Sequence, residues 1–196
     1  MTDDHFVYTS GKHGEVYVNK DAIYPHPEEV SQVGQLFAEK YKETDIDVVA
    51  APALGGIILS TWTAYHLSKM KGKEILGVYA EKMPDKSMAF TRGYDALIRG
   101  KNVLVIEDLT TTGGSVKKVV DLVRETGGNV VSVCVMVNRN PDGVNAESIG
   151  APFESLGVLK AEAWDENELP EHIKARPINT HVGHGKKYME RKKSGE

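Results

Sequence analysis

The sequence is poor in cysteine, since Cys134 is the only one among its 196 residues. A single thiol excludes a disulfide within the chain and a zinc site built on a Cys-x-x-Cys pair. Cys134 lies inside the apolar run VVSVCVMV at residues 130–137. We therefore expect it to be a small buried core residue rather than a reactive thiol.

The sequence also lacks an excess of positive charge and a long apolar run. Its formal net charge is −4 at pH 7, whereas general affinity for nucleic acid needs a basic surface. No apolar stretch approaches the roughly 20 residues that cross a bilayer. The polar start MTDDHFVYTSGKHGE has no apolar centre like that of a signal peptide. We therefore predict a cytoplasmic protein that binds neither nucleic acid nor membranes.

What the chain does contain is an alternation of helical and strand patterns. Residues 28–43 and 115–128 carry apolar residues at helical spacing, and residues 55–72 are typical of a largely buried helix. Strands separated by single helices predict an α/β fold with a mainly parallel sheet. The runs that predict strands are 46–52, 75–80, 101–108, 129–139 and a last one beginning at 155.

Two segments interrupt this alternation. Residues 83–100 combine proline, glycine and mixed charge without a steady period, which predicts a long loop or a hairpin. The polar residues from about 165 to 196 include Pro170 and Pro177 and predict an appendage rather than a second domain. Because the length suits one domain, we expect residues 1–196 to form a single domain.

The stretch VLVIEDLTTTGGS at residues 103–115 joins groups that suit two different tasks. Open parallel sheets bind ligands beyond the carboxyl ends of their strands, and a helix N-terminus attracts anions. The Thr, Gly and Ser residues of 111–115 therefore suit a phosphate. Glu107 and Asp108, which directly precede them, suit sugar hydroxyls. The stretch predicts a site for a sugar phosphate.

Two common phosphate-binding motifs are absent from the sequence. It contains neither the P-loop pattern G-x-x-x-x-G-K-[ST] nor a G-x-G-x-x-G turn between strand and helix. A purely structural alternative is a helix start capped by Thr112 or Ser115. A cap needs only one such residue and does not explain two acids followed by TTTGGS.

This stretch resembles the signature of the type I phosphoribosyltransferases, with Glu107 where the first Asp is more usual. Within that superfamily, residues 6–160 resemble the orotate phosphoribosyltransferases. The narrower likeness rests on FVYTSGKHGEVYVNKD (6–21), on APALGGIIL (51–59) and on Arg139. The resemblance implies a mainly parallel sheet flanked by helices, a mobile loop, and a small hood formed by about 6–24 and 165–196.

The resemblance also implies a reaction: the phosphoribosyl group of phosphoribosyl pyrophosphate (PRPP) is transferred to a nucleobase, most closely orotate, and pyrophosphate leaves. Glu107 and Asp108 would hold the ribose hydroxyls. Lys82 would neutralise the leaving group, with Lys86 and Arg92 as further cations of the loop. Mg²⁺ would be held through PRPP without direct protein ligands, and the expected assembly is a homodimer.

Further contacts follow from the same resemblance. The remaining PRPP-binding residues would be Leu54, Gly55, Gly56, Leu109, Thr110, Thr111, Thr112, Gly113, Gly114 and Ser115. Thr111, Arg139 and Tyr17 would contact the base.

Two alternatives remain open at this point. A purine salvage enzyme would use the same PRPP site, although Arg139 and the N-terminal segment favour a pyrimidine. A PRPP-sensing regulator would keep the fold without catalysis. It is suggested by Glu81-Lys82, where the family usually has Arg-Lys, and by the few basic residues of 81–90.

Overall fold

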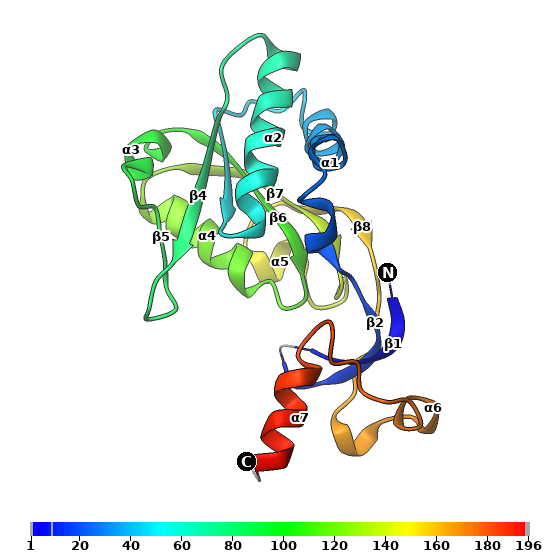
Figure 1. Cartoon of the computed structure of the whole chain (residues 1–196). Coiled ribbons are helices and arrows are strands. Elements are labelled where there is room, and N and C mark those ends of the chain that lie inside the picture. Colours follow the sequence, from blue (N-terminus) through cyan, green and yellow to red (C-terminus); the bar gives the residue numbers. More distant parts are fainter. Residues whose placement is uncertain (1, 9, 195–196) are drawn as a thin grey trace. The chain divides into compact units, whose positions relative to one another are not determined.

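The apolar runs form a six-stranded sheet in the order β5-β4-β3-β6-β7-β8 (Figure 1). Every neighbouring pair is parallel except β4 and β5, which are antiparallel. The prediction of a mainly parallel sheet is confirmed. The strands are β3 (Val48–Pro52), β4 (Leu76–Lys82), β5 (Met88–Ala89), β6 (Asn102–Thr110), β7 (Asn129–Asn138) and β8 (Phe153–Val158).

This sheet belongs to one of two compact units into which the chain divides. The computed structural model describes residues 2–8 and 10–194. One unit is Asp21–Leu159, which holds the sheet, and the other combines Met1–Lys20 with Lys160–Glu196. In the described part of the chain, no helix has the length and apolarity needed to cross a bilayer.

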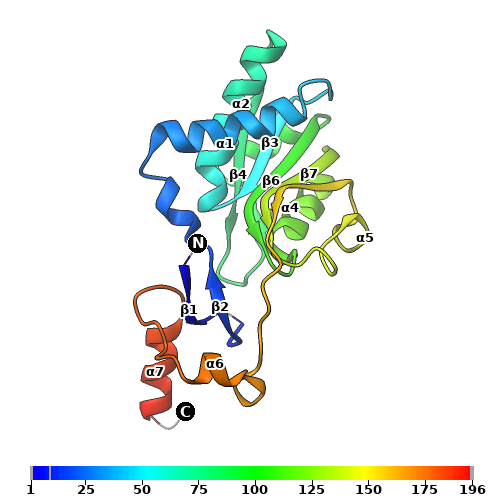
Figure 2. The ribbon, with the colours of Figure 1, turned by 90° about the vertical axis from the view of Figure 1, so that its right-hand side faces the viewer.

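Helices cover both faces of the sheet (Figure 2). Phe37 and Leu59, from α1 and α2, pack with Leu104 and Ile106 of β6 on one face. The apolar side of α4 packs with Val105 of the same strand on the other face. Alternating residues of β6 therefore serve opposite layers, as strand geometry requires. The helices are α1 (Pro27–Lys40), α2 (Gly55–Lys71), α3 (Tyr94–Ile98), α4 (Gly114–Glu125) and α5 (Ala146–Ile149).

Three of these helices, α1, α2 and α4, confirm the predicted helical segments. Cys134 is fully buried in the layer under α1 and α2, as predicted. Burial raises the pKa of its thiol to about 12, so the side chain stays protonated and unreactive at neutral pH.

The segment 83–100 begins as a hairpin, since β5 pairs with the end of β4 through Glu81 opposite Ala89 and Lys82 opposite Met88. The hairpin was one of the two predicted forms. The short helix α3 that follows was not predicted, because its five residues are too few to show a helical period.

The path of the chain through the sheet reverses once. From β3 the chain moves outward to β4 and β5, and it then returns past β3 to β6 before moving outward to β7 and β8. The reversal leaves the carboxyl ends of β3 and β6 adjacent, each followed by a loop that leads into a helix.

The second unit combines segments from both terminal regions of the chain. In it, β1 (Thr2–Val7) pairs antiparallel with β2 (His13–Tyr17). The later segment runs beside β1, where the Asn179 amide donates to the His5 carbonyl at 2.8 Å. The buried rings of His5 and His13 are hydrogen bonded at 2.9 Å. The segment after residue 160 holds η2 (Glu166–Glu168), α6 (Glu171–Lys174) and α7 (Gly185–Ser194). At the other end of the chain, η1 (Lys20–Ile23) follows β2.

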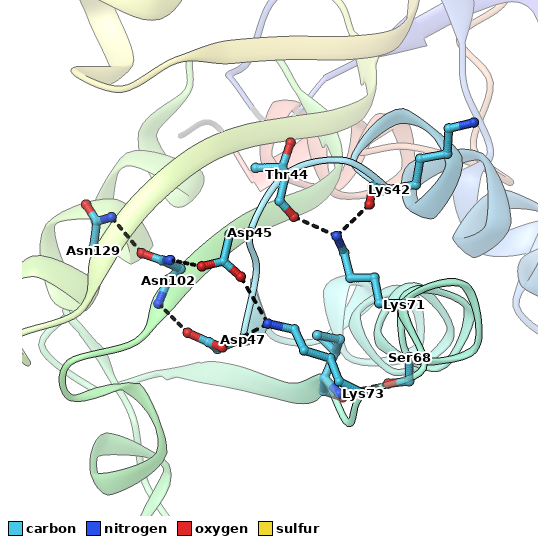
Figure 3. A network of polar contacts seen from close by, with 10 residues as sticks. Lys42, Thr44, Asp45, Asp47, Ser68, Lys71, Lys73, Asn102 and Asn129 are labelled. Atoms are coloured by element: carbon cyan, nitrogen blue, oxygen red, sulfur yellow. Dashed lines mark hydrogen bonds and ion pairs between the residues drawn. The ribbon is translucent and has the colours of Figure 1, made fainter.

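A polar network joins the amino ends of β3 and β6, at the opposite end of these strands from their adjacent carboxyl ends (Figure 3). Asp47 accepts a hydrogen bond from the Asn102 amide at 3.1 Å and one from Lys73 at 3.3 Å. Asp45 contacts the same Lys73 at 3.0 Å, but its side chain is 75% exposed, against 32% for Asp47. The Asp47 carboxylate therefore links the start of β3 to that of β6.

We predict that Asp47→Ala lowers the free energy of unfolding by about 1–2 kcal/mol, because it leaves a partly buried strand amide without its acceptor. Asp45→Ala is the matched control. It removes an exposed ion pair of the same lysine and an exposed hydrogen bond from the Asn102 side chain, and it should cost no more than about 0.5 kcal/mol. Urea unfolding followed by circular dichroism measures both values, and equal losses would contradict the assignment.

Candidate functional site

The candidate site lies at the adjacent carboxyl ends of β3 and β6. The two strands run parallel, with Val48 opposite Val103 and Ala50 opposite Val105. A reversal of strand order is where open parallel sheets bind ligands. The sequence assigned residues 54–56, which follow β3, and residues 107–115, at the end of β6 and just after it, to the ligand.

Asp108 has both carboxylate oxygens held in place. Its Oδ1 accepts a hydrogen bond from the Leu109 amide at 2.6 Å, and its Oδ2 accepts one from the Tyr24 hydroxyl at 2.8 Å. Only 4% of the residue is exposed. Its orientation is therefore set by protein groups before any ligand arrives.

Gly55 brings the other loop against this carboxylate. A Cβ atom added to Gly55 would lie 1.9 Å from Asp108 Oδ2 and 2.7 Å from the Tyr24 hydroxyl oxygen. Any larger residue would force the carboxylate to move. The close approach joins the start of α2, which follows β3, to Asp108 near the end of β6.

Tyr24 is a residue that sequence reasoning missed. It lies between η1 and α1, and its ring packs at the edge of the core under α1 and α2. Burial raises the pKa of its phenol, and the Asp108 carboxylate raises it further. A single tyrosine in an irregular turn carries no periodic or motif signal, so only the fold reveals this contact.

Glu107 is buried like its neighbour, with 9% of the residue exposed. It lies opposite Val135 in the pairing of β6 with β7. Because successive residues of a strand point to opposite faces, the two adjacent carboxylates are directed apart. Strand geometry thereby relieves the repulsion that their adjacency in sequence suggests.

The Thr-Gly loop leads directly into α4. The Thr110 hydroxyl is buried and accepts a hydrogen bond from the Gly113 amide at 2.9 Å. Gly113 is the N-cap residue with φ of 74°, so neither Thr112 nor Ser115 caps the helix as the structural alternative required. Thr111, Thr112, Gly114 and Ser115 are exposed at this helix start. Exposed amides and hydroxyls at a helix N-terminus suit an anion such as a phosphate.

The loop after β3 is equally open at its tip. The peptide bond between Ala53 and Leu54 is cis, and α2 begins at the next residue, Gly55. Leu54 is 83% exposed. Gly56 packs inward, since an added Cβ would lie 2.6 Å from the Cβ of Ala51. The loop therefore presents backbone rather than side chains beside Asp108.

Arg139 follows the end of β7, the next strand of the sheet. Its amide donates to the Thr110 carbonyl at 2.9 Å, so the backbone of Arg139 lies beside the Thr-Gly loop. Asn138, just before it, is buried and donates to the Val144 carbonyl at 3.0 Å. Asn138 shapes the turn after β7, a role that the sequence did not indicate.

Lys82 is the last residue of β4, Lys86 lies in the turn between β4 and β5, and both side chains are exposed. The Lys86 carbonyl accepts a hydrogen bond from Lys118 of α4 at 2.7 Å. Arg92, the further candidate cation, forms an ion pair with Glu81 at 3.2 Å. Hydrogen bonds from Thr91 and Arg92 lower the pKa of the Glu81 carboxyl group. The two lysines thus lie on the exposed β4–β5 hairpin, whose first strand, β4, pairs with β3.

Tyr17 lies in the other unit, at the end of β2. It is half-buried, and its ring lies 5.4 Å from that of Phe6 between centroids. Its predicted contact with the base stays a prediction.

Among residues 2–8 and 10–194, no group of three or more His, Cys, Asp or Glu side chains is arranged to hold a metal ion. The carboxylate of Asp108 is already engaged by Tyr24 and Leu109.

Comparison with known proteins gives a consistent result. The model of the phosphoribosyl transferase domain matches residues 19–149. The orotate phosphoribosyltransferase of Caldanaerobacter subterraneus subsp. tengcongensis is 39% identical over 166 residues, which are 85% of this chain and 82% of the relative. That of Thermotoga maritima is 36% identical over 170 residues, 87% of this chain and 85% of the relative.

Solved structures agree with these sequence matches. The orotate phosphoribosyltransferase of Mycobacterium tuberculosis H37Rv in complex with PRPP matches with a TM-score of 0.62 and 26% identity. The match covers 81% of this chain and 89% of that one.

We predict that Gly113→Ala lowers the free energy of unfolding by about 1–2 kcal/mol, because φ is 74° there and a Cβ would lie 2.8 Å from Ile149 Cδ1. The neighbouring Gly114→Ala is the matched control. Its Cβ would meet Thr112 at an ordinary 3.5 Å, so the change should stay within about 0.5 kcal/mol. Urea unfolding compares them, and a smaller loss for Gly113→Ala than for Gly114→Ala would refute the geometry.

Proposed function

The chain belongs to the phosphoribosyltransferase family, and we propose that it transfers the 5-phosphoribosyl group of PRPP to orotate. The products are orotidine 5′-phosphate and pyrophosphate, as in pyrimidine nucleotide synthesis. Curated relatives at 39% and 36% identity carry the name orotate phosphoribosyltransferase, and a similar solved structure is a complex with PRPP. These relatives support both the donor and the acceptor.

The observation that carries this proposal is the contact of Gly55 with the Asp108 carboxylate, next to an exposed helix start. We assign Asp108 to the ribose hydroxyls, with Glu107 as the second acid. Breaking the bond at the anomeric carbon leaves a sugar that resembles an oxocarbenium ion. Fixed carboxylates favour that developing positive charge, and a fixed ribose keeps the anomeric carbon in line with the attacking nitrogen.

The two loops suit the two ends of PRPP. Residues 109–115 would bind the 5′-phosphate through the amides and hydroxyls at the start of α4. Leu54, Gly55 and Gly56 would bind the pyrophosphate through backbone amides at the start of α2. The supporting features are the exposed residues of the first loop and the small residues of the second, which let an anion approach the backbone.

The leaving pyrophosphate needs positive charge. Lys82 is the proposed catalytic cation, with Lys86 in the hairpin turn and Arg92 just beyond β5 as further candidates. The exposure of both lysines on one element supports a loop that closes over bound substrate and carries them in. Mg²⁺ on the pyrophosphate oxygens would neutralise further charge, since this hard cation needs few protein ligands when phosphates are present.

Recognition of the base is assigned to three residues. Arg139 would pair with the carboxylate or a carbonyl of orotate, in the two-pronged manner that guanidinium allows. The position of its backbone beside Thr110 supports this, because Thr111 follows directly and is also assigned to the base. Tyr17 would stack on the ring from the predicted hood, to which the segments 6–24 and 165–196 are assigned.

A homodimer is the proposed assembly. Leu54, Ile58 and Tyr65 are exposed large apolar residues at and along α2, four and seven positions apart. Residues at this spacing share one face of a helix, and an exposed apolar face supports contact with a partner subunit.

We predict that the protein, incubated with Mg²⁺, PRPP and orotate, releases pyrophosphate with a turnover on the order of 10 per second. The comparison uses uracil, adenine, hypoxanthine, guanine and xanthine in separate reactions, with pyrophosphate measured by a coupled assay. Orotate should be the preferred acceptor.

Two outcomes would overturn this proposal. Turnover with a purine alone would identify a purine salvage enzyme. PRPP binding without turnover of any base would identify a PRPP-sensing regulator instead.

A further inference from the structure

Tyr24 joins the candidate site from a part of the chain that the signature loop does not include. Its hydroxyl donates to Asp108 Oδ2 at 2.8 Å across 84 positions of sequence. Its amide donates to the Asp21 carbonyl at 3.4 Å, and its ring packs against the core under α1 and α2. Turn and packing together hold the hydroxyl over the carboxylate.

The plane of a carboxylate needs such a restraint. The terminal torsion of an aspartate side chain is broad, so one hydrogen bond leaves its two oxygens free to swing. In Asp108 the Leu109 amide holds Oδ1 and the Tyr24 hydroxyl holds Oδ2. Gly55 lies against Oδ2 as well, where an added Cβ would lie only 1.9 Å away. The plane of this carboxylate is therefore fixed from both sides.

We infer that Tyr24 is a positioning residue for the transferase reaction: its hydroxyl orients Asp108 to receive the hydroxyls of the PRPP ribose. This inference rests on the proposed function. Tyr24 acts through Asp108 and not on the reacting atoms. It adds the segment before α1 to a site otherwise built from the loops after β3, β6 and β7.

The state of the phenol suits this role. Burial and the neighbouring Asp108 carboxylate raise the pKa of Tyr24, so its hydroxyl keeps its proton throughout the neutral range. A protonated phenol donates to Asp108 Oδ2 and leaves the negative charge on the carboxylate. A phenylalanine would fill the same space without this hydrogen bond.

The test compares Tyr24→Phe with Tyr41→Phe in the complete chain. Tyr41 is a matched control, because its buried hydroxyl also donates to a carboxylate, that of Glu154 at 2.8 Å, and packs in the same core layer. Tyr24→Phe should lower kcat/KM for PRPP by about 10- to 100-fold, the loss expected when a group is misplaced by up to about 1 Å. The KM for orotate should stay unchanged. Tyr41→Phe should change only the melting temperature.

A double-mutant cycle separates positioning from a general structural role. Tyr24→Phe should weaken the Kd for PRPP, measured by calorimetry, in the wild-type background. In an Asp108→Ala background, which removes the carboxylate that Tyr24 contacts, the same change should alter that Kd less than twofold, because the two residues act through one contact. Full additivity of the two losses would overturn the inference, as would wild-type kinetics in Tyr24→Phe. A wild-type chain that binds no PRPP would overturn the proposed function and the inference together. Wild-type turnover with an unaffected Tyr24→Phe variant would overturn the inference alone.

Discussion

The approach of the Gly55 backbone to the Asp108 carboxylate is the constraint on which the site depends. It requires a residue without a side chain at the start of α2, since a Cβ there would lie 1.9 Å from Oδ2. It also requires β3 and β6 to be neighbours, because only then do the loops after them meet. The parallel sheet, its single reversal and the two helix starts all serve to bring these two segments together.

The same constraint explains how one small site can serve two kinds of chemistry. Because carboxylates repel phosphates, the acids and the amides that bind anions must lie close together but face different parts of the ligand. Gly55 and Tyr24 hold the Asp108 carboxylate near the end of β6, and the chain then changes direction at Gly113 to present the start of α4. Acids at the strand end and amides at the helix start suit the ribose and phosphate of one ligand.

Much of the fold could be predicted from the sequence, because the patterns that indicate it lie within short stretches of the chain. Helices α1, α2 and α4 and the parallel strands follow from the apolar period within short windows. Helix α3 was missed because five residues show no period, and Tyr24 was missed because its partner lies 84 positions away. The base contacts assigned to Tyr17 and Arg139 depend on long-range arrangement too, so they remain predictions.

The central claim is that the Gly55–Asp108 contact forms the PRPP site, and the affinity of Gly55→Ala for PRPP tests it most directly. Calorimetry should show a Kd at least about tenfold weaker than that of the wild type, a loss of about 1.4 kcal/mol. Gly157→Ala is the control, since its Cβ would meet only the Met136 carbonyl at 3.6 Å, and it should bind PRPP normally. If Gly55→Ala binds PRPP as tightly as the wild type, this account of the site is wrong.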